Sequence, residues 1–463
     1  MWDPSILWHD GKYYAFMMYS KETANGLDAG HCLLAVSGDG VHWRTEGVVL
    51  EELDLARGCK FFKCMVARCG DRFIMDHGVM RPEGQDMLRF YESRDLKDWS
   101  YLFSSRPDPR WYALPPGLNR WDHMYILPKE EGNHSAGYWG YPVALVKPGD
   151  PRGIAMMQSP DGLEWEVLPP AKVEWGDLPP FGIILEWGGC ERIDGKYYLI
   201  GGGDYLGFTG YGMFVFVADH PRGPFRPTAD TTRLCGSSDT TVSWLAGWSR
   251  GNGELLISNS ASMVAGTVGA PSLLPLRKPI LDGNGSLRLG WWKGNEALKG
   301  KPLGPIETAL TLDAANGYAV TYLQKSFRPE RGLVVEGTLR ARPSAANAAA
   351  GFALDEGDGK ALATLLGVGA PQGRETHIGR LDVAAGTFNI LDRTGKHCAT
   401  VTGIAPGREH SFRLLSRLSL FELYIDDRLM QTFVYEPAAG RIGFVARHAY
   451  LQVAGLKAWE MSL

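Results

Sequence analysis

The stretch Ser37-Gly-Asp-Gly-Val-His-Trp43 combines a tight Asp-Gly turn with a following aromatic residue. Glycine supplies the positive φ that such a turn needs, and the aromatic side chain closes the hairpin. The unit returns about every 60 residues, a length that holds about four short strands, or one blade of a β-propeller. Its further copies are Ser93-Arg-Asp-Leu-Lys-Asp-Trp99, Ser159-Pro-Asp-Gly-Leu-Glu-Trp165 and the variant Ala218-Asp-His-Pro-Arg-Gly-Pro-Phe225.

A second repeated element, a turn followed by an aromatic or apolar strand, precedes most of these units. Its copies are Asp10-Gly-Lys-Tyr-Tyr14, Gly70-Asp-Arg-Phe73, Asp194-Gly-Lys-Tyr-Tyr198 and Gly251-Asn-Gly-Glu-Leu255. The two patterns together predict a five-bladed β-propeller over residues 1–295. The acidic residues of the turns are interpreted as structural, because an Asp-Gly pair is what a tight hairpin turn requires.

The composition changes after Trp291-Trp-Lys-Gly-Asn-Glu-Ala-Leu-Lys-Gly300, where the repeat ends. Beyond it, strands alternate in a different style, as in Phe421-Glu-Leu-Tyr-Ile-Asp426, which places apolar side chains on one face. Short strands with Gly-rich turns predict a β-sandwich over residues 306–463. The predicted fold class is therefore all-β, a five-bladed propeller followed by a C-terminal β-sandwich.

The overall composition excludes several function classes. A formal charge of −4 offers neither a basic face for nucleic acid nor a polybasic membrane patch. No segment approaches the roughly 20 apolar residues of a membrane helix. Seven scattered cysteines without a CxxC pair suggest reduced thiols, and the start of the sequence lacks a signal-peptide pattern. We expect a cytoplasmic protein, or a secreted one if the N-terminus is truncated, and leave the oligomeric state open.

Three acidic residues lie outside the turn motifs, at the start of a repeat, where the innermost strand of a blade lines the central channel. Asp3 precedes the first aromatic hairpin, Asp122 opens the third blade, and Glu186 opens the fourth. Glycoside hydrolysis needs one carboxylic acid to protonate the leaving oxygen and one carboxylate to attack or to activate water. A third can bind sugar hydroxyls. The apolar neighbours of Glu186 suit an acid catalyst, and Glu191 is its rival.

These segments resemble those of glycoside hydrolase family 32 and its relative family 43. Trp2-Asp-Pro-Ser5 is similar to the opening strand, whose Asp is the nucleophile in family 32 and the base in family 43. Arg120-Trp-Asp122 is similar to an Arg-Asp-Pro site that binds sugar hydroxyls, and the segment from Glu186 to Gly195 resembles the acid-catalyst segment. Pro271–Arg277 and Arg413–Asp427 are similar to the segments that close the propeller and form the sandwich of family 32.

The resemblance implies that Asp3 is the nucleophile, Glu186 the acid and base, and Asp122 the residue that holds ring hydroxyls of a terminal β-fructofuranoside. The substrate would be an oligosaccharide or a small glycoside. Ser5, Trp121, His123 and Trp187 depart from the family spellings, which puts the identity of the sugar in doubt. The predicted substrate-binding residues are Trp2, Arg120, Trp121, His123, Trp187 and Asp239.

Each of these assignments has a plainer alternative. Trp121 and Trp187 suit core packing as well as sugar stacking, His123 suits a structural histidine, and Asp239 suits a turn. No group of residues shows the spacing of metal ligands, so no metal and no cofactor are expected. Two other functions stay open: an inverting arabinofuranosidase or xylosidase similar to family 43, and a carbohydrate-binding propeller without catalysis.

Overall fold

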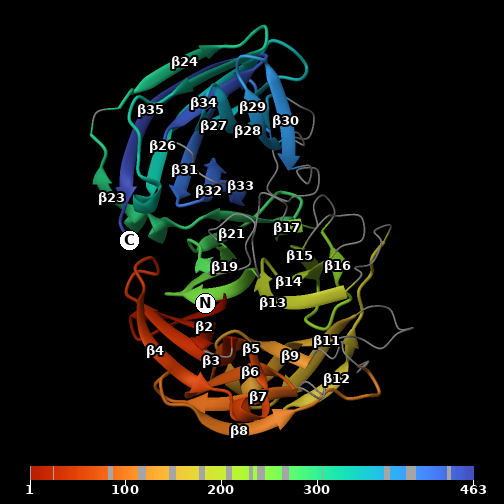
Figure 1. Cartoon of the computed structure of the whole chain (residues 1–463). Helices are drawn as coiled ribbons and strands as arrows, with labels where there is room; N and C mark the ends of the chain where they lie inside the picture. The colour runs from red at the N-terminus through yellow and green to blue at the C-terminus, as the bar shows by residue number, and fades with distance from the viewer. Residues whose placement is uncertain are drawn as a thin grey trace. The chain divides into compact units, whose positions relative to one another are not determined.

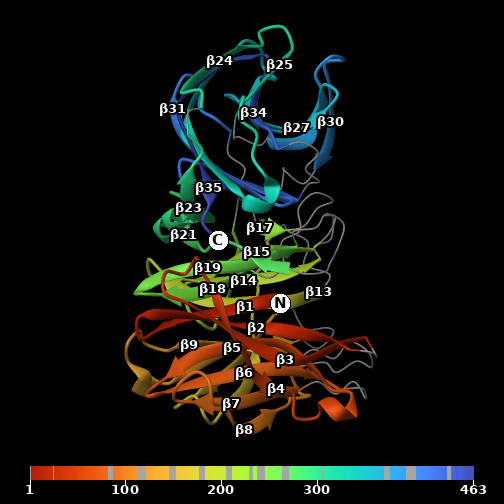
Figure 2. The same cartoon turned by 60° about the vertical axis from the view of Figure 1, so that its left-hand side comes forward.

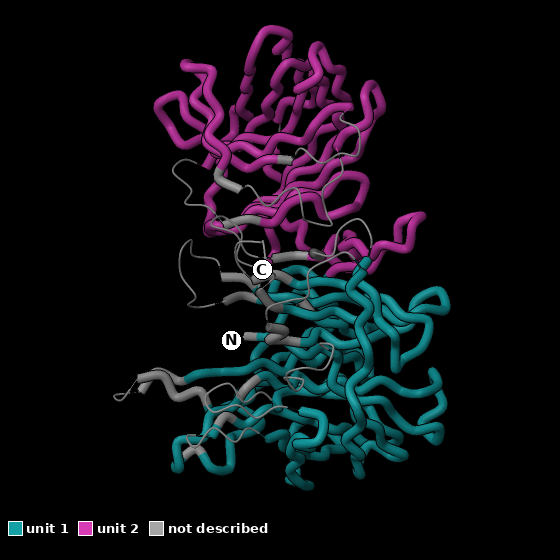
Figure 3. Tube along the Cα trace, turned by 90° about the vertical axis from the view of Figure 1, so that its right-hand side faces the viewer, with its two compact units in different colours: residues 1–233, 244–261, 271–276 teal, residues 234–243, 262–270, 277–463 magenta. Residues whose placement is uncertain are grey.

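The structure is a computed structural model in which strands and turns dominate (Figure 1). It describes residues 2–23, 26–81, 87–112, 121–144, 153–176, 183–204, 211–228, 233–236, 246–262, 271–304, 306–369, 376–392, 403–434 and 440–463. By its packing the chain divides into two compact units, residues 1–233, 244–261 and 271–276 in the first and the remainder in the second (Figure 3). The predicted domain limits at residues 295 and 306 stay predictions.

The first unit contains four complete antiparallel sheets, each formed by strands in chain order (Figure 1). Every sheet is a series of hairpins, which is the arrangement of a propeller blade. The first has β1 (Trp2–His9), β2 (Lys12–Thr23), β3 (Gly26–Ser37) and β4 (Arg44–Glu51). The second has β5 (Lys60–Cys69), β6 (Arg72–Met80), β7 (Met87–Ser93) and β8 (Ser100–Ser105).

The third and fourth sheets repeat this order, and a fifth begins after them. The third has β9 (Trp121–Pro128), β10 (Tyr138–Ala144), β11 (Ile154–Ser159) and β12 (Glu166–Ala171). The fourth has β13 (Ile183–Ile193), β14 (Lys196–Asp204), β15 (Tyr211–Ala218) and β16 (Arg226–Pro227). β17 (Arg233–Gly236) also pairs with β15, and the fifth sheet begins with β18 (Ala246–Gly251) and β19 (Glu254–Ser262), with β20 (Pro271–Leu273) beside β19.

The first strands of the five sheets form a closed ring. β1 contacts β5 and β18, β5 contacts β9, and β13 contacts both β9 and β18. A ring of five inner strands around a central channel is the signature of a five-bladed propeller. The predicted fold of the first part of the chain is therefore confirmed.

The repeated turns are held by the serine and the aspartate that the sequence repeats. In the second blade the hydroxyl of Ser93 accepts hydrogen bonds from the amides of Asp95 and Leu96. Asp95 Oδ1 accepts from the amides of Asp98 and Lys97, which lowers the pKa of Asp95 below its ordinary value. The units at Ser37 and Ser159 make the same bonds. These aspartates are structural, as predicted.

The second unit is a sandwich of two antiparallel sheets (Figure 2). One sheet runs β21 (Arg277–Leu281), β22 (Leu287–Trp291), β33 (Arg428–Val434), β32 (Leu420–Ile425), β31 (Glu409–Arg417), β26 (Leu333–Pro343), β35 (Ala449–Met461) and β23 (Lys299–Pro302), with β24 (Ala309–Asp313) beside β35. The other runs β25 (Tyr318–Tyr322), β34 (Ile442–Arg447), β27 (Ala349–Gly357), β28 (Lys360–Gly367), β29 (Thr376–Asp382) and β30 (Thr387–Asp392).

Aromatic and branched side chains from both sheets fill the core of the sandwich. The ring of Phe352 on β27 lies 5.0 Å from that of Phe412 on β31 and 5.3 Å from that of Phe444 on β34. The alternation of apolar residues along Phe421 to Ile425 places Leu423 and its neighbours in this core. The all-β fold class, a propeller followed by a sandwich, is confirmed.

The helices of the described residues are short 3-10 turns, and none is long and apolar enough to cross a bilayer. They are η1 (Leu55–Arg57), η2 (His134–Ala136), η3 (Lys293–Leu298) and η4 (Pro329–Arg331).

A fully buried ion pair joins two strands of the second unit. The guanidinium of Arg277 on β21 donates to Glu422 Oε1 on β32, and both side chains are fully buried. Tyr424 donates its hydroxyl to Glu422 Oε2 at 3.0 Å. The two opposite charges thus compensate each other, whereas either one alone would be costly in this environment.

We expect Glu422→Gln to lower the free energy of unfolding by about 3 kcal/mol or more, because it leaves the charge of Arg277 buried without its counterion. Urea unfolding followed by tryptophan fluorescence measures the effect. The matched control is Glu330→Gln, which removes an exposed partner of Arg328 and should change the free energy by less than about 1 kcal/mol. Equal midpoints for the two variants would contradict the role of the buried pair.

Candidate active site

Asp3 lies near the start of β1, at an irregularity of the strand. The pairing of β1 with β2 shifts register between Trp2 and Ser5, and Asp3 has a φ of 52°. A bulge of this kind re-aims a side chain that regular alternation would place differently. Asp3 is partly exposed. The backbone of Trp2 pairs with that of Met18, while its side chain lies outside the described part of the structure.

Asp122 is the second residue of β9 and is buried. Its Oδ1 accepts a hydrogen bond from the amide of His123 at 2.7 Å. The carboxylate packs on the backbone of Gly78 in β6, where an added Cβ would lie 2.1 Å from Oδ1. The register with β10 shifts beside Asp122, between Pro142 and Val143. Only a residue without a side chain leaves room for this carboxylate.

Glu186 lies on β13, where its backbone pairs with Gly202. The register shifts on both sides of it, between Ile184 and Glu186 and between Trp187 and Gly189. The side chain of Glu186 lies outside the described residues, so its separation from Asp3 stays open. The three predicted acids nevertheless share one structural feature: each lies where an inner strand departs from regular pairing with its neighbour.

Lys63, on the second inner strand, shares this feature and was not predicted. The register of β5 with β6 shifts between Phe61 and Cys64, the interval that contains Lys63. Lys63 is buried, and its ammonium lies 3.7 Å from the place of a Cβ on Gly247 of β18. The start of the second blade thus contributes a cation where three other blades carry an acid.

Asp76, on β6, is a second residue that the sequence reasoning missed. Its Oδ1 accepts a hydrogen bond from the amide of Met124 at 2.6 Å, and its side chain is fully buried. Burial raises the pKa of Asp76 well above its ordinary value, and the charge of Asp122 adds to the rise; the Met124 amide and Lys63 oppose it. A buried carboxyl with a raised pKa therefore lies next to Asp122 and Lys63 and lines the same channel. A charged residue within the apolar run Arg72–Met80 was the available signal.

The structure describes some of the predicted substrate-binding residues and leaves others outside the described part of the chain. Trp121 is fully buried, with its ring 5.3 Å from that of Tyr112 in the core of the third blade. Trp187 is also buried and packs edge-on against Phe216 at 6.3 Å. The burial of both side chains favours the core-packing alternative, and their roles in substrate binding stay predictions. The spacing of a tryptophan beside an acid does not reveal which of the two faces the channel.

His123 is fully buried between the third and fourth blades. Its Nε2 lies 2.9 Å from the carbonyl oxygen of Trp187 and donates to it, and its Nδ1 lies 3.5 Å from Asp122 Oδ1. His123 therefore acts on the site through its neighbours, and the structural alternative describes it better than direct substrate binding. Arg120 and Asp239 lie outside the described residues, and their roles stay predictions.

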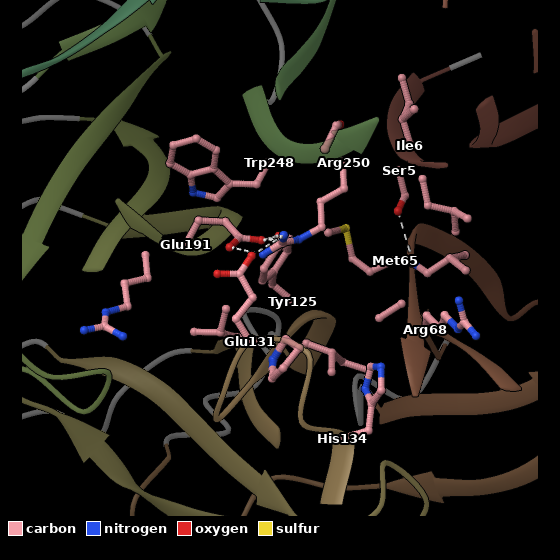
Figure 4. A pocket seen from close by; sticks show the side chains of 18 of the residues that line it. Ser5, Ile6, Met65, Arg68, Tyr125, Glu131, His134, Glu191, Trp248 and Arg250 are labelled. Atoms are coloured by element: carbon pink, nitrogen blue, oxygen red, sulfur yellow. Dashed lines mark hydrogen bonds and ion pairs between the residues drawn. The ribbon is translucent and has the colours of Figure 1, made fainter. Parts of the chain in front are cut away.

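A cavity of about 570 Å³ occupies the channel beyond the predicted acids (Figure 4). Each inner strand contributes to its wall, for example through Ser5, Met65, Tyr125, Glu191 and Arg250, and Asp76 also lines it. Polar groups from several blades thus converge on one pocket, the usual setting of a ligand site.

Glu191, the sequence-based rival of Glu186, is engaged in this cavity. Its Oε2 accepts from Arg250 at 2.5 Å, while Oε1 accepts from Arg250 at 3.1 Å and from the hydroxyl of Tyr125 (Figure 4). These bonds connect β9, β13 and β18 around the channel. A carboxylate with both oxygens occupied serves the ring of blades better than it serves proton transfer to a substrate.

Comparisons with known proteins place the fold. No family model matches the sequence, and no curated protein matches it. A family 32 β-fructofuranosidase from Bombyx mori superposes with a TM-score of 0.67 at 13% identity, over 100% of this chain and 91% of that one. The chain has the fold of the family 32 glycoside hydrolases. At such low identity the match establishes the fold alone.

Two further solved structures agree with this assignment. Fructan 1-exohydrolase IIa from Cichorium intybus gives a TM-score of 0.68 at 12% identity, over 100% of this chain and 95% of that one. Sucrose-6-phosphate hydrolase from Lactobacillus gasseri gives 0.66 at 14% identity, over 99% and 90%. The resemblance found in the sequence is thereby confirmed at the level of the fold, and it extends through both units.

The raised pKa of Asp76 predicts how stability depends on pH. The unfolded chain releases this proton near the ordinary carboxyl pKa of about 4, whereas the folded chain retains it to higher pH. The contribution of Asp76 is therefore full below about pH 4 and is lost as the pH rises toward the folded pKa. We expect Asp76→Asn, which keeps the acceptor for Met124, to lose less stability than the wild type as the pH rises above the ordinary carboxyl pKa.

Urea midpoints across this range measure the difference. Asp95→Asn is the matched control, because the lowered pKa of Asp95 leaves that carboxyl ionised in both states above about pH 5. Its slope should equal that of the wild type. An equal slope for Asp76→Asn would show that Asp76 is already ionised in the folded protein.

Proposed function

We propose that the protein is a glycoside hydrolase that cleaves terminal furanosides, β-fructofuranosides first, with retention of anomeric configuration. The observation that carries the proposal is the coincidence of two findings. The chain has the family 32 fold over its full length, and the inner strands become irregular where the sequence places Asp3, Asp122 and Glu186. Bulges next to a channel are a common device for presenting catalytic side chains.

In this mechanism Asp3 attacks the anomeric carbon and forms a covalent glycosyl-enzyme. Glu186 first protonates the departing oxygen and then removes a proton from the water that hydrolyses the intermediate. Asp122 accepts hydrogen bonds from ring hydroxyls as the sugar flattens toward the transition state. A partly exposed nucleophile near the start of β1 and a buried hydroxyl acceptor on β9 are consistent with these roles.

Lys63 and Asp76 adapt the site of this particular chain. The raised pKa of Asp76 favours its protonated form, which can donate a hydrogen bond, and the Lys63 ammonium supplies positive charge in a part of the channel with low exposure to water. Since Trp121 is in the core, the ammonium is a better candidate than that ring for a sugar contact. This cation is the feature with which we expect substrate preference to vary.

The proposal is tested with Asp3→Asn and Glu186→Gln. Each removes a reacting group at nearly constant shape, so kcat on chromogenic fructofuranosides, sucrose or inulin should fall by about 1,000-fold or more. The control Asp10→Asn changes an aspartate in the turn after β1, where Asn also tolerates positive φ, and should leave kcat within about twofold. Full activity of both Asp3→Asn and Glu186→Gln would refute the mechanism.

The anomer released first, followed by nuclear magnetic resonance, separates the remaining possibilities. Retention supports the double-displacement mechanism, and inversion would identify chemistry like that of family 43. Binding of fructosides by calorimetry without turnover of any furanoside or pyranoside would identify a carbohydrate-binding propeller.

The close packing of Asp122 on the backbone of Gly78 gives an independent test of the role of Asp122. In Gly78→Ala the new methyl group would meet Asp122 Oδ1 at 2.1 Å and its Cα at 3.0 Å, so the carboxylate must move. We expect kcat/KM to fall by about 100-fold, since a displacement of about 1 Å can cost that much. Gly38→Ala is the control, because a Cβ at Gly38 meets nothing within 4 Å. Equal activity in both variants would argue against a role for Asp122.

A further inference from the structure

The cavity of about 570 Å³ is formed by the later half of each inner strand, downstream of the predicted acids (Figure 4). Its wall includes Trp8 of β1, which lies five residues after Asp3. It also includes Glu191 of β13, which lies five residues after Glu186. Five residues of extended strand span about 16 Å. Among the described residues, neither Asp3 nor Asp122 lines the cavity, so this space is separate from the predicted catalytic centre.

Two aromatic side chains of the wall are partly exposed. Trp8 packs edge-on against Tyr13, with the ring centres 4.6 Å apart, and this contact fixes the orientation of the indole. Tyr197 of β14 comes from the fourth blade, and the guanidinium of Arg192 lies 5.9 Å from the centre of its ring. Both residues line the cavity. An accessible aromatic face is an apolar surface that suits the C–H face of a sugar ring.

The charged groups of the wall nearly balance one another. Glu191 binds Arg250 with both of its oxygens, and Glu131 Oε1 lies 3.7 Å from Arg250 Nη1 (Figure 4). The cations of the wall are Arg68, Lys129, Arg192 and Arg250, and its carboxyl groups are those of Asp76, Glu130, Glu131 and Glu191. A ligand with a large net charge gains little from such a wall. A neutral ligand rich in hydroxyls fits it better, because each hydroxyl both donates and accepts.

Three polar groups of the wall have unused capacity for hydrogen bonds. Arg68 donates its Nε hydrogen to the carbonyl oxygen of Gly70 at 3.2 Å, which leaves its two terminal nitrogens as donors. Arg192 is exposed and has no ion pair within the described residues. Asp76 is fully buried, and its Oδ2 has no hydrogen-bond partner within the described residues. A buried polar atom without a partner is costly, so a ligand hydroxyl that bonds Oδ2 gains affinity.

We propose that the downstream half of the channel is a second carbohydrate-binding site, which holds a neutral sugar of one or two rings against Trp8 and Tyr197. Hydroxyls of the sugar bond to Arg68, Arg192 and Asp76. The volume of about 570 Å³ falls within the range of small-molecule sites. This site goes beyond the proposed hydrolysis, because it binds sugar without using the catalytic carboxylates.

Fluorine nuclear magnetic resonance of the full chain labelled with 5-fluorotryptophan tests the proposal. Fructose and glucose are the probes, since neither has a glycosidic bond to cleave and the result does not depend on hydrolysis. Trp8→Phe assigns the resonance of Trp8, and Trp99→Phe assigns that of Trp99, which packs on Phe16 outside the cavity. At least one sugar should shift the Trp8 resonance in a saturable way and leave the Trp99 resonance unchanged.

Tyr197→Ala should weaken the sugar dependence of the Trp8 shift by about 10-fold or more, since loss of one aromatic contact in a small-ligand site has an effect of this order. Tyr101→Ala is the matched control, because Tyr101 is an exposed tyrosine of β8 outside the cavity, and it should bind sugar as the wild type does. Crystals of the wild type soaked in the same sugars locate the ligand if a variant fails to fold. No shift at Trp8 with either sugar, sugar density only beside Asp3 and Asp122, or a shift with inorganic phosphate alone would overturn the proposal.

Discussion

Closure of five inner strands into one ring is the constraint on which the rest of the first unit depends. Strands that meet around a narrow channel must point some side chains into it, and those side chains are confined with little water. The chain meets this demand by neutralising or pairing its polar groups. Glu191 is bound by Arg250 and Tyr125, and Asp76 is held by a backbone amide of the next blade. Each contact joins neighbouring blades, so the polar groups inside the ring also hold its blades together.

The same ring explains why the irregular pairing matters. A regular strand sends alternate residues to fixed faces, and a bulge changes which residue faces the channel. β1, β5, β9 and β13 all depart from regular pairing near their starts. The channel therefore has two chemically different parts: an upstream part shaped by bulges and a downstream part built from regular strands and ion pairs.

Much of the fold could be predicted from the sequence because its determinants are local. The hydrogen bonds of the turn at Ser93 to Asp98 lie within six residues. The repeat could therefore be recognised in the sequence, and it predicted the number of blades. The candidate site could be predicted only in part. The positions of Asp3 and Asp122 before a hairpin could be predicted from the sequence, but the burial of Trp121 could not, because a bulge at β9 decides which neighbour turns inward. Lys63 was missed since only acids were sought, and Asp76 since its role depends on contacts with β9.

The serine and aspartate turns have a consequence for how such a molecule can change. In sequence these turns come late in each blade, whereas the first strand of the blade lines the channel. The serine and aspartate side chains of each turn accept hydrogen bonds from backbone amides of the same loop. Replacing a side chain that faces the channel leaves those bonds intact. The residues that stabilise the blades are thus different from the residues that face the channel. A chain built this way can change the side chains of its channel, or gain a cation there such as Lys63, while the turns of its blades stay the same.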